Sequence, residues 1–256
     1  MSASCVQWRI EAANVAVVTL DRPPVNALSR EVRVALIAAF DALDADVDVR
    51  AIVLTAKGKV FCAGADIKEK AALAGDSTHY LRANRLTRDG FFCILDSSKP
   101  VIAAVQGAAL GAGCVLAACC DMIFAAETAV FGLPEIDVGQ GGGASFMQRI
   151  LPASKVRRMT LTGERVPAAE FYRLGAVEAC VSDGELMPAA LGMASVIAAK
   201  PPGAVRRIRG AFSTVEALSV RDGFHVEQAY TTELSRSPEG VAARQAFFER
   251  RKEAKP

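Results

Sequence analysis

Two kinds of apolar stretch predict a sheet covered by helices. Residues 15–21, VAVVTLD, alternate and are rich in β-branched side chains, which is typical of a strand. AIVLTA at 51–56 and VIAAV at 101–105 are continuous apolar runs, as in parallel strands buried on both faces. Between the first two strands, the PPVNALS turn precedes a helix predicted from about Arg30 to Asp44. This order of elements indicates an α/β fold.

The third strand leads into a glycine turn and a helix that we expect to end near Cys120. The stretches MIFAAE at 122–127 and VFGLPEIDVG at 130–139 predict further short extended pieces. After Asp183 the pattern becomes helical and more charged, with a last helix predicted over 221–236. The PPG at 201–203 is the clearest boundary, so we divide the chain into a core, residues 1–200, and a C-terminal helical region, residues 201–256.

The run from 101 to 120 contains no charged residue and is long enough to cross a bilayer. It consists mainly of Ala, Gly and Cys, however, which gain little from insertion into lipid. A buried strand, a tight turn and a close-packed helix explain it better. We therefore expect a cytoplasmic protein that does not enter the membrane.

Composition excludes several function classes. The 256 residues carry a formal net charge of +2 and only 6% aromatic residues, which gives no reason to expect binding to nucleic acid. The two histidines and seven cysteines show none of the spacings of metal sites or disulfide frameworks, so no metal is expected. A GxSxG nucleophile motif and a P-loop are both absent from the sequence.

Two turns, CAGAD at 62–66 and LGAGC at 110–114, each follow a strand and precede a helix. Small residues there leave backbone N–H groups exposed at the head of the next helix. Donors from two such turns can face one oxygen atom, which is the arrangement of an oxyanion hole. Spacing alone favours a simpler interpretation, that Gly and Ala permit close packing of helix on sheet. Dinucleotide binding is a weaker alternative, because Leu116 occupies the place of the third small residue of that motif.

Glu135 lies in FGLPEIDVGQGGG at 131–143, between apolar neighbours. Apolar surroundings raise the pKa of a carboxyl group, which suits it to proton transfer near neutral pH. The glycines that follow would let a substrate approach the backbone closely and begin a helix. A single Glu beside a turn can equally be a solvated surface residue.

Taken together, the motifs resemble one family. The segments VFCAGADIKE at 60–69, KPVIAAVQGAALGAGCVLAACCD at 99–121 and FGLPEIDVG at 131–139, in this order and spacing, closely resemble the enoyl-CoA hydratase/isomerase (crotonase) family. The likeness extends from DRPPVNAL at 21–28 through 161–181 to the closing AFFERRK. It implies a crotonase-like spiral of repeated ββα units, with a C-terminal helical region that packs at subunit interfaces in trimers or dimers of trimers.

The resemblance also implies roles for individual residues. Members of the family bind an acyl-CoA thioester and hold its carbonyl oxygen with two backbone N–H groups, which here would belong to Ala65 and Ala112. Glu135 matches a catalytic glutamate. The CoA moiety is part of the substrate, so no separate cofactor is expected. The CoA-binding positions of the family match six residues. Ala63, Ala65, Asp66 and Ile67 match the loop that binds adenine, mainly through its backbone. Val25 matches a position that lines the pantetheine, and Arg250 matches a C-terminal basic contact. Lysines at 57, 59, 68 and 70 surround the first turn as a basic rim that suits the CoA phosphates.

One departure affects the expected reaction. Hydratases of the family use a second glutamate, and its position is occupied by Val115, which can neither hold water nor exchange a proton. A single Glu is sufficient to move a proton between two carbons, so we favour double-bond isomerisation through a thioester enolate. Hydration, decarboxylation or retro-aldol cleavage in the same oxyanion hole, and a catalytically silent CoA-binding protein, remain alternatives. The dienoyl-type isomerases would require an Asp where Gly143 stands.

Overall fold

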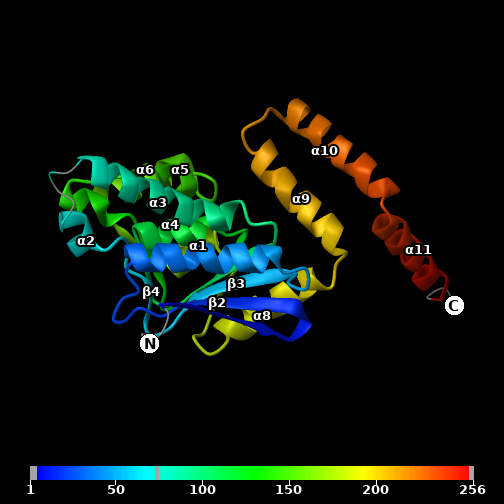
Figure 1. Cartoon of the computed structure of the whole chain (residues 1–256), viewed down its shortest axis with the longest axis horizontal. Helices are drawn as coiled ribbons and strands as arrows, with labels where there is room; N and C mark the ends of the chain where they lie inside the picture. Colours follow the sequence, from blue (N-terminus) through cyan, green and yellow to red (C-terminus); the bar gives the residue numbers. More distant parts are fainter. Residues whose placement is uncertain (1–4, 73–74, 76, 254–256) are drawn as a thin grey trace.

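Two β-sheets form the centre of the protein in a computed structural model that describes residues 5–72, 75 and 77–253 (Figure 1). The larger sheet has the strand order β1-β2-β3-β5-β7-β10 and the smaller one β4-β6-β8-β9. The strands are β1 (Val6–Glu11), β2 (Val15–Leu20), β3 (Ala51–Ala56), β4 (Val60–Cys62), β5 (Val101–Val105), β6 (Ala108–Leu110), β7 (Met122–Ala126), β8 (Val130–Gly132), β9 (Arg165–Pro167) and β10 (Ala179–Val181).

Helices follow the strands in a regular order. They are α1 (Arg30–Ala45), α2 (Ile67–Ala72), α3 (Ser77–Leu95), α4 (Ala112–Cys119), α5 (Ala144–Met147), α6 (Ala153–Thr162), α7 (Ala168–Arg173), α8 (Leu186–Ala198), α9 (Pro202–Val215), α10 (Val220–Arg236) and α11 (Pro238–Glu253), with 3₁₀ turns η1 (Ala12–Asn14) and η2 (Pro134–Val138). Three successive strand pairs, β3–β4, β5–β6 and β7–β8, place their first strand in the larger sheet and their second in the smaller one. This repetition confirms the expected spiral of ββα units.

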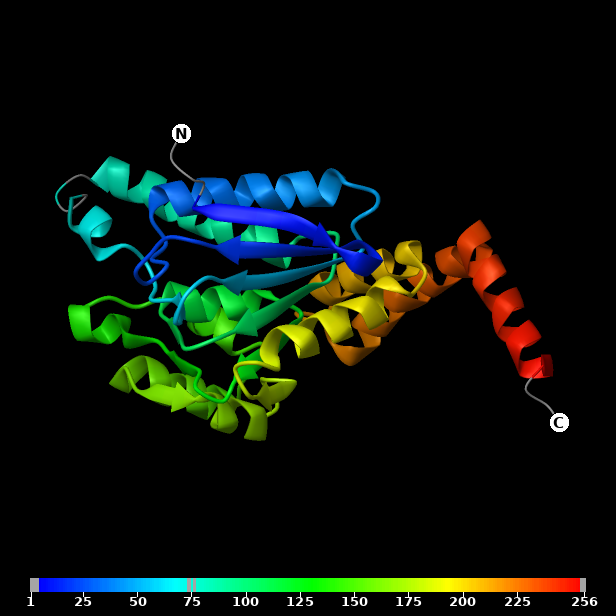
Figure 2. The same ribbon diagram turned by 90° about the horizontal axis from the view of Figure 1, so that it is seen from below.

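Helices on both faces explain why the central strands are continuously apolar. Val15 and Val17 of β2 pack with α8, whereas Ala16 and Val18 face the cluster that contains α1 and α4. Figure 2 shows α1 and α8 on different sides of the strands. Every residue of β3 and β5 is buried as a result.

The uncharged run 101–120 is part of this core. It forms β5, β6 and α4. The sequence did not predict β6 as a separate strand, since only three residues pair with β4 and β8. Within the described part of the chain, no helix is both long and apolar enough to cross a membrane.

The expectation of extended structure through residues 130–139 was partly wrong. Only Val130–Gly132 form a strand, and Pro134–Val138 form the 3₁₀ turn η2. Pro134 suits the start of a helical turn because its φ is fixed and its missing N–H is not needed there. Gly139, with φ 66°, ends the turn in the left-handed conformation.

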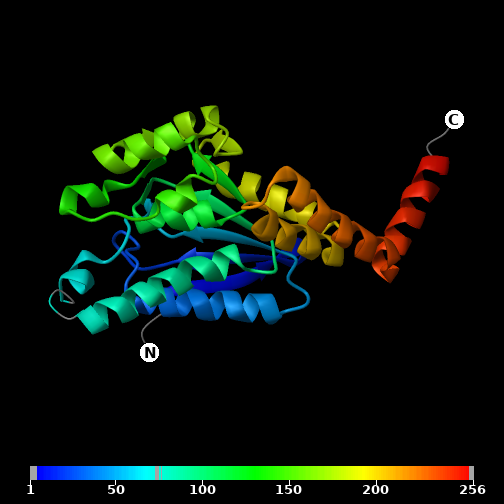
Figure 3. The same ribbon diagram turned by 90° about the horizontal axis from the view of Figure 1, so that it is seen from above.

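The C-terminal helices extend away from the sheets. The expected boundary at residue 200 falls between α8 and α9, and PPG begins α9 rather than forming a linker. Arg209 joins α9 to the core, because its Nε donates to Asp121 Oδ2 at 2.8 Å and its Nη2 to Ile94 O at 3.0 Å. Beyond α10, α11 projects from the body of the molecule (Figure 3).

Candidate active site

The structure brings the two glycine-containing turns together. Strand β4 pairs with β6 in parallel, with Cys62 opposite Ala109, so the turns that follow the two strands lie at the same edge of the sheet. A methyl group placed on Gly64 would lie 2.9 Å from Leu110 O and 3.6 Å from Ala112 N. The absence of a side chain at Gly64 therefore allows the first turn to touch the second.

Ala112 begins α4, which is buried along its entire length. Gly111, with φ 53° and ψ −123°, adopts a backbone conformation that L-residues rarely take, and its own N–H donates to Gly132 O at 2.8 Å. As the first residue of the helix, Ala112 has no carbonyl one turn earlier to accept its N–H. Its amide is thus available to a bound oxygen.

The Ala65 amide is similarly placed in the first turn. Its neighbours are engaged, since the Ala63 N–H donates to Val25 O at 3.0 Å and the Asp66 N–H to Leu28 O at 3.4 Å. The Ala65 N–H donates in none of the hydrogen bonds found among the described residues. Two separate turns therefore each present one free backbone donor.

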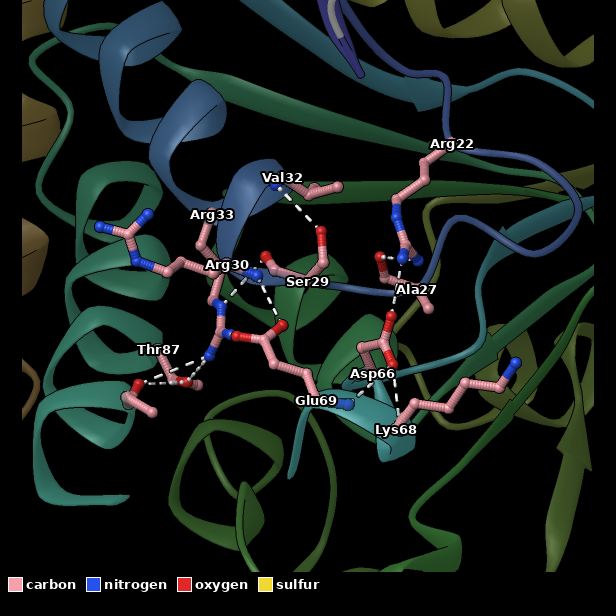
Figure 4. A network of polar contacts seen from close by, with 11 residues as sticks. Arg22, Ala27, Ser29, Arg30, Val32, Arg33, Asp66, Lys68, Glu69 and Thr87 are labelled. Atoms are coloured by element: carbon pink, nitrogen blue, oxygen red, sulfur yellow. Dashed lines mark hydrogen bonds and ion pairs between the residues drawn. The ribbon is translucent and has the colours of Figure 1, made fainter. Parts of the chain in front are cut away.

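Charged side chains hold the first turn and α2 in place (Figure 4). The carboxylate of Asp66 accepts from Arg22 Nη2 at 2.7 Å and from the N–H groups of Lys68 and Glu69 at the start of α2. The Glu69 N–H is the main cause that lowers the pKa of Asp66, and Arg22 adds to it. Glu69 in turn accepts from Arg33 Nη2 at 2.7 Å, so α2 is joined to α1.

A cavity of about 440 Å³ opens in front of the two turns. Its walls are the first turn and α2, one side of α3, the beginning of α4, η2 and the loop that follows η2. The lining residues are Ala63, Gly64, Ala65, Ile67, Lys70, Asn84, Thr87, Phe91, Gly111, Ala112, Val115, Pro134, Glu135, Asp137, Val138, Gln140, Gly141, Gly142 and Gly143.

Glu135 lies directly against the second turn. A methyl group on Gly111 would be 2.6 Å from Glu135 Oε1, and Oε2 is buried without a hydrogen-bond partner. Burial raises the pKa of this carboxyl group, although its own backbone N–H and the charge of Lys70 act in the opposite direction. A carboxyl group with a raised pKa and one oxygen that has no hydrogen-bond partner, beside a free amide, is suited to take up and release a proton.

Val115 and Gly143 form an apolar wall of the same cavity. A methyl group on Gly143, which has φ 79°, would overlap Val115 Cγ2, so the two positions are in contact. Besides Glu135, the only carboxylate among the described lining residues is Asp137, which lies beside Gly163, the residue that follows α6. Of these two carboxyl groups, that of Glu135 is the one that lies against Gly111 of the second turn.

Comparison with known proteins identifies the relationship. The family model described as enoyl-CoA hydratase/isomerase matches residues 10–255. The chain belongs to the enoyl-CoA hydratase/isomerase family. Within this family it is similar to a probable enoyl-CoA hydratase of Rhizobium meliloti, with 38% identity over 93% of each chain. It is also similar to "(7aS)-7a-methyl-1,5-dioxo-2,3,5,6,7,7a-hexahydro-1H-indene-carboxyl-CoA hydrolase" of Mycobacterium tuberculosis, with 36% identity over 92% of this chain and 95% of that one.

Solved structures of the family confirm the crotonase fold. A crystal structure of enoyl-CoA hydratase from Mycobacterium smegmatis superposes with a TM-score of 0.93 at 31% identity, and the match covers 97% of each chain. An enoyl-CoA hydratase from Bacillus anthracis gives a TM-score of 0.91 at 28% identity, over 96% of each chain.

Most residues that the family resemblance points to lie at the cavity. Ala63, Ala65 and Ile67 line it, and Asp66 lies next to them, with its side chain engaged by Arg22 and its backbone N–H by Leu28 O. Val25 does not line the cavity but adjoins it through its hydrogen bond with Ala63.

Arg250 is not brought to this site within one chain. It is exposed on α11. This helix lies at the end of the molecule opposite α2 (Figures 1 and 3).

Sequence reasoning missed two features of the site. It placed Lys70 in an outer basic rim, whereas the side chain lines the cavity. It also gave no sign of the contact between Arg33 and Glu69, which lie 36 positions apart. The spacing of Ile67 and Lys70, three residues apart on a short helix, is the signal that could have placed both on one face.

Proposed function

We propose that this member of the enoyl-CoA hydratase/isomerase family isomerises the double bond of an acyl-CoA thioester through an enolate. The N–H groups of Ala65 and Ala112 bind the thioester oxygen, which carries the negative charge of the enolate. Glu135 removes a proton from one carbon and returns it to another. A 3-enoyl-CoA thereby becomes a 2-enoyl-CoA with no gain or loss of atoms.

The position of Glu135 supports this proposal most directly. Its carboxyl group contacts Gly111, the residue before Ala112, and its pKa is raised by burial. The base and one of the two donors are thus neighbours on the same side of the cavity. Val115 and Gly143 supply no second proton donor and no group that would hold a water molecule, which favours proton transfer over hydration.

The test compares two reactions of the unmodified protein. We expect isomerisation of 3-enoyl-CoA to be faster than hydration of 2-enoyl-CoA, measured on short and long chains. Glu135→Gln should lower turnover by on the order of 10²- to 10⁴-fold, because it removes the acid–base group, while affinity for the thioester changes little. Glu127→Gln, at an exposed position outside the cavity, is the matched control.

Two outcomes would count against the proposal. Faster hydration than isomerisation would replace it with a hydratase assignment. Binding of acyl-CoA without turnover of any acyl-CoA tested would indicate a silent binding protein of the same fold.

A second candidate is hydrolytic cleavage of a carbon–carbon bond. The similarity to a Mycobacterium tuberculosis protein named as a hydrolase of a dioxo-indene-carboxyl-CoA favours a hydrolytic reaction of such a thioester. Glu135 would then activate water for attack on a ring ketone, and the broken bond would leave its electron pair as the same thioester enolate. Protonation of that enolate completes the reaction. Release of a ring-opened carboxylic acid from a cyclic dione thioester would distinguish this reaction from isomerisation.

The C-terminal helices suggest how the protein assembles. They expose large apolar side chains, among them Phe212, Phe224, Phe247 and Phe248. Exposed apolar surface of this kind is typical of protein interfaces. We propose a homotrimer or a hexamer, which sedimentation analysis would test. Arg250 could then reach CoA only in a neighbouring subunit.

A further inference from the structure

The helix α2 directs three consecutive side chains to three different surroundings. Lys68 is exposed and does not line the cavity, Glu69 reaches Arg33 on α1, and Lys70 lines the cavity. Successive helical residues are rotated by about 100° from one another, which produces this separation. Figure 4 shows Lys68 and Glu69 directed away from each other. Among the described residues, Lys70 is the only cationic side chain on the cavity wall.

Lys70 connects two elements that line the cavity. Its Nζ donates to Gln140 Oε1 at 3.0 Å, and Gln140 follows η2, the element that carries Glu135. Its charge is near enough to lower the pKa of Glu135. An ammonium group has three N–H donors, and Gln140 is the only acceptor found for Nζ in the described chain. Two donors therefore remain for a ligand.

A hydrocarbon acyl chain would fit such a wall poorly. It would displace water from the ammonium group and offer no hydrogen bond in exchange, which is costly for a charged donor. A ligand oxygen near Nζ would replace the lost water. Glu135 and Asp137 already bring two carboxyl groups to a cavity with one cation, so a neutral oxygen suits the site better than another carboxylate.

We propose that Lys70, together with Gln140, recognises a keto oxygen on the acyl group of the substrate, beyond the thioester carbonyl. This inference rests on the proposed acyl-CoA function. It names the substrate class of the same site, acyl-CoA thioesters that carry a second carbonyl group.

The experiment uses three 3-enoyl-CoA thioesters of equal chain length. One ends in a hydrocarbon, one carries a keto group on the distal part of the chain, and one ends in a carboxylate. We expect kcat/KM for the keto substrate to exceed that for the hydrocarbon by roughly ten- to hundredfold, the range for a hydrogen bond to a charged group. Lys70→Met should bring this ratio close to one, and Lys70→Arg should retain part of it.

Lys68→Met is the matched control, since it removes the same charge from the opposite face of α2. It should leave the ratio of the two substrates unchanged. If Lys70 instead binds the CoA phosphates, Lys70→Met would lower kcat/KM equally for all three substrates and preserve the ratio. That result would overturn the proposal. An equal ratio in the unmodified protein, or a preference for the carboxylate, would also overturn it.

Binding measurements separate this inference from the proposed function. The Glu135→Gln variant should still bind the keto thioester more tightly than the hydrocarbon, because recognition does not require turnover. If the unmodified protein turns over none of the thioesters but the binding preference is present and lost in Lys70→Met, the isomerase proposal fails and the recognition by Lys70 stands. If the protein turns over the thioesters but shows no preference for the keto thioester, the recognition by Lys70 fails and the isomerase proposal stands.

Discussion

The two turns that present Ala65 and Ala112 are held in place by different forces. The second turn leads into α4, all of whose residues are buried, and Gly113 packs against the backbone of Cys62. The first turn leads into α2, which has no buried residue. An ion pair of Glu69 with Arg33 joins α2 to α1, and an ion pair of Asp66 with Arg22 holds the residue just before α2. One half of the proposed oxyanion site is therefore fixed by the apolar core, and the other by polar contacts near the surface.

Because of this difference, we expect changes in the second turn to affect mainly stability and changes near the first turn to affect mainly activity. Apolar packing contributes to the folding of the entire domain, so damage to the second turn should lower the stability of the protein. Polar contacts at the edge of the domain contribute less to folding, but they position one donor. Small errors in position are costly to catalysis.

Gly113→Ala should have the largest effect, on stability. The added methyl group would overlap Cys62 O and lie 2.7 Å from Cys62 Cβ, which forces α4 away from β4. Overpacking of this kind costs about 1–3 kcal/mol, and thermal unfolding should show a melting temperature lowered by several degrees. Gly192→Ala in α8 is the control, since a methyl group there meets nothing within 4 Å. An unchanged melting temperature in Gly113→Ala would show that the second turn is not fixed by packing.

Glu69→Gln should lower activity more than stability. The side chain of Arg33 is 8% exposed and that of Glu69 26%, so the pair is largely shielded from water. Loss of the charge loosens α2 and with it the position of Ala65. We expect kcat/KM to fall by roughly tenfold, as for a charge-assisted hydrogen bond.

The control for this change is Glu170→Gln, which breaks an exposed pair with Arg173 outside the cavity. A Glu69→Gln protein with full activity but a strongly reduced melting temperature would contradict the division between the two turns.

Arg22→Met should have a smaller effect of the same kind. Arg22 is 35% exposed and Asp66 keeps its bonds to the N–H groups of Lys68 and Glu69 when the arginine is removed. The pair is open to water at its Arg22 end, where an ion pair contributes less than a buried one, so kcat/KM should fall by no more than about fivefold. A loss as large as that of Glu69→Gln would show that Asp66, rather than Glu69, controls the first turn.

The pH dependence of activity distinguishes the role of Glu135 as a base from the role of Asp66 in holding the first turn. Burial raises the pKa of Glu135, so kcat/KM should decrease on acidification through a value above the ordinary range of a glutamate. The charge of Lys70 lowers the pKa of Glu135, so Lys70→Met should move this decrease to higher pH. Asp66 behaves in the opposite way, since its pKa is lowered. Its stabilising contacts are present above the unfolded pKa of about 3.9 and are lost only as the pH falls through the lower, folded value.

Rate measurements between about pH 4 and pH 8 on the unmodified protein and Lys70→Met test this prediction. A shift to lower pH in the variant, or no shift, would contradict the account of Glu135.

The sequence predicted the packed half of the molecule better than the polar half. The strands at 15–20, 51–56 and 101–105 and the helix from Arg30 follow from local periodicity, because burial imposes an apolar pattern on consecutive residues. The helical turn at Glu135 and the short strand at 108–110 were missed, since each depends on a few residues and on neighbours distant in the chain.

The candidate site shows the same limit. Both turns and Glu135 could be identified because each lies within one recognisable segment. The pairing of Arg33 with Glu69, and the inward direction of Lys70, arise only when α1, α2 and η2 come together. The local sequence pattern does not predict which distant side chain a charged residue contacts.

The central claim is that two separate turns share one thioester oxygen beside Glu135. A crystal structure with a bound, unreactive acyl-CoA analogue tests it most directly. We expect the thioester oxygen within about 2.7–3.1 Å of both the Ala65 and Ala112 nitrogens, and the Glu135 carboxyl group facing the carbon next to the thioester. A thioester oxygen remote from either nitrogen, or a Glu135 side chain turned into solvent, would contradict the account.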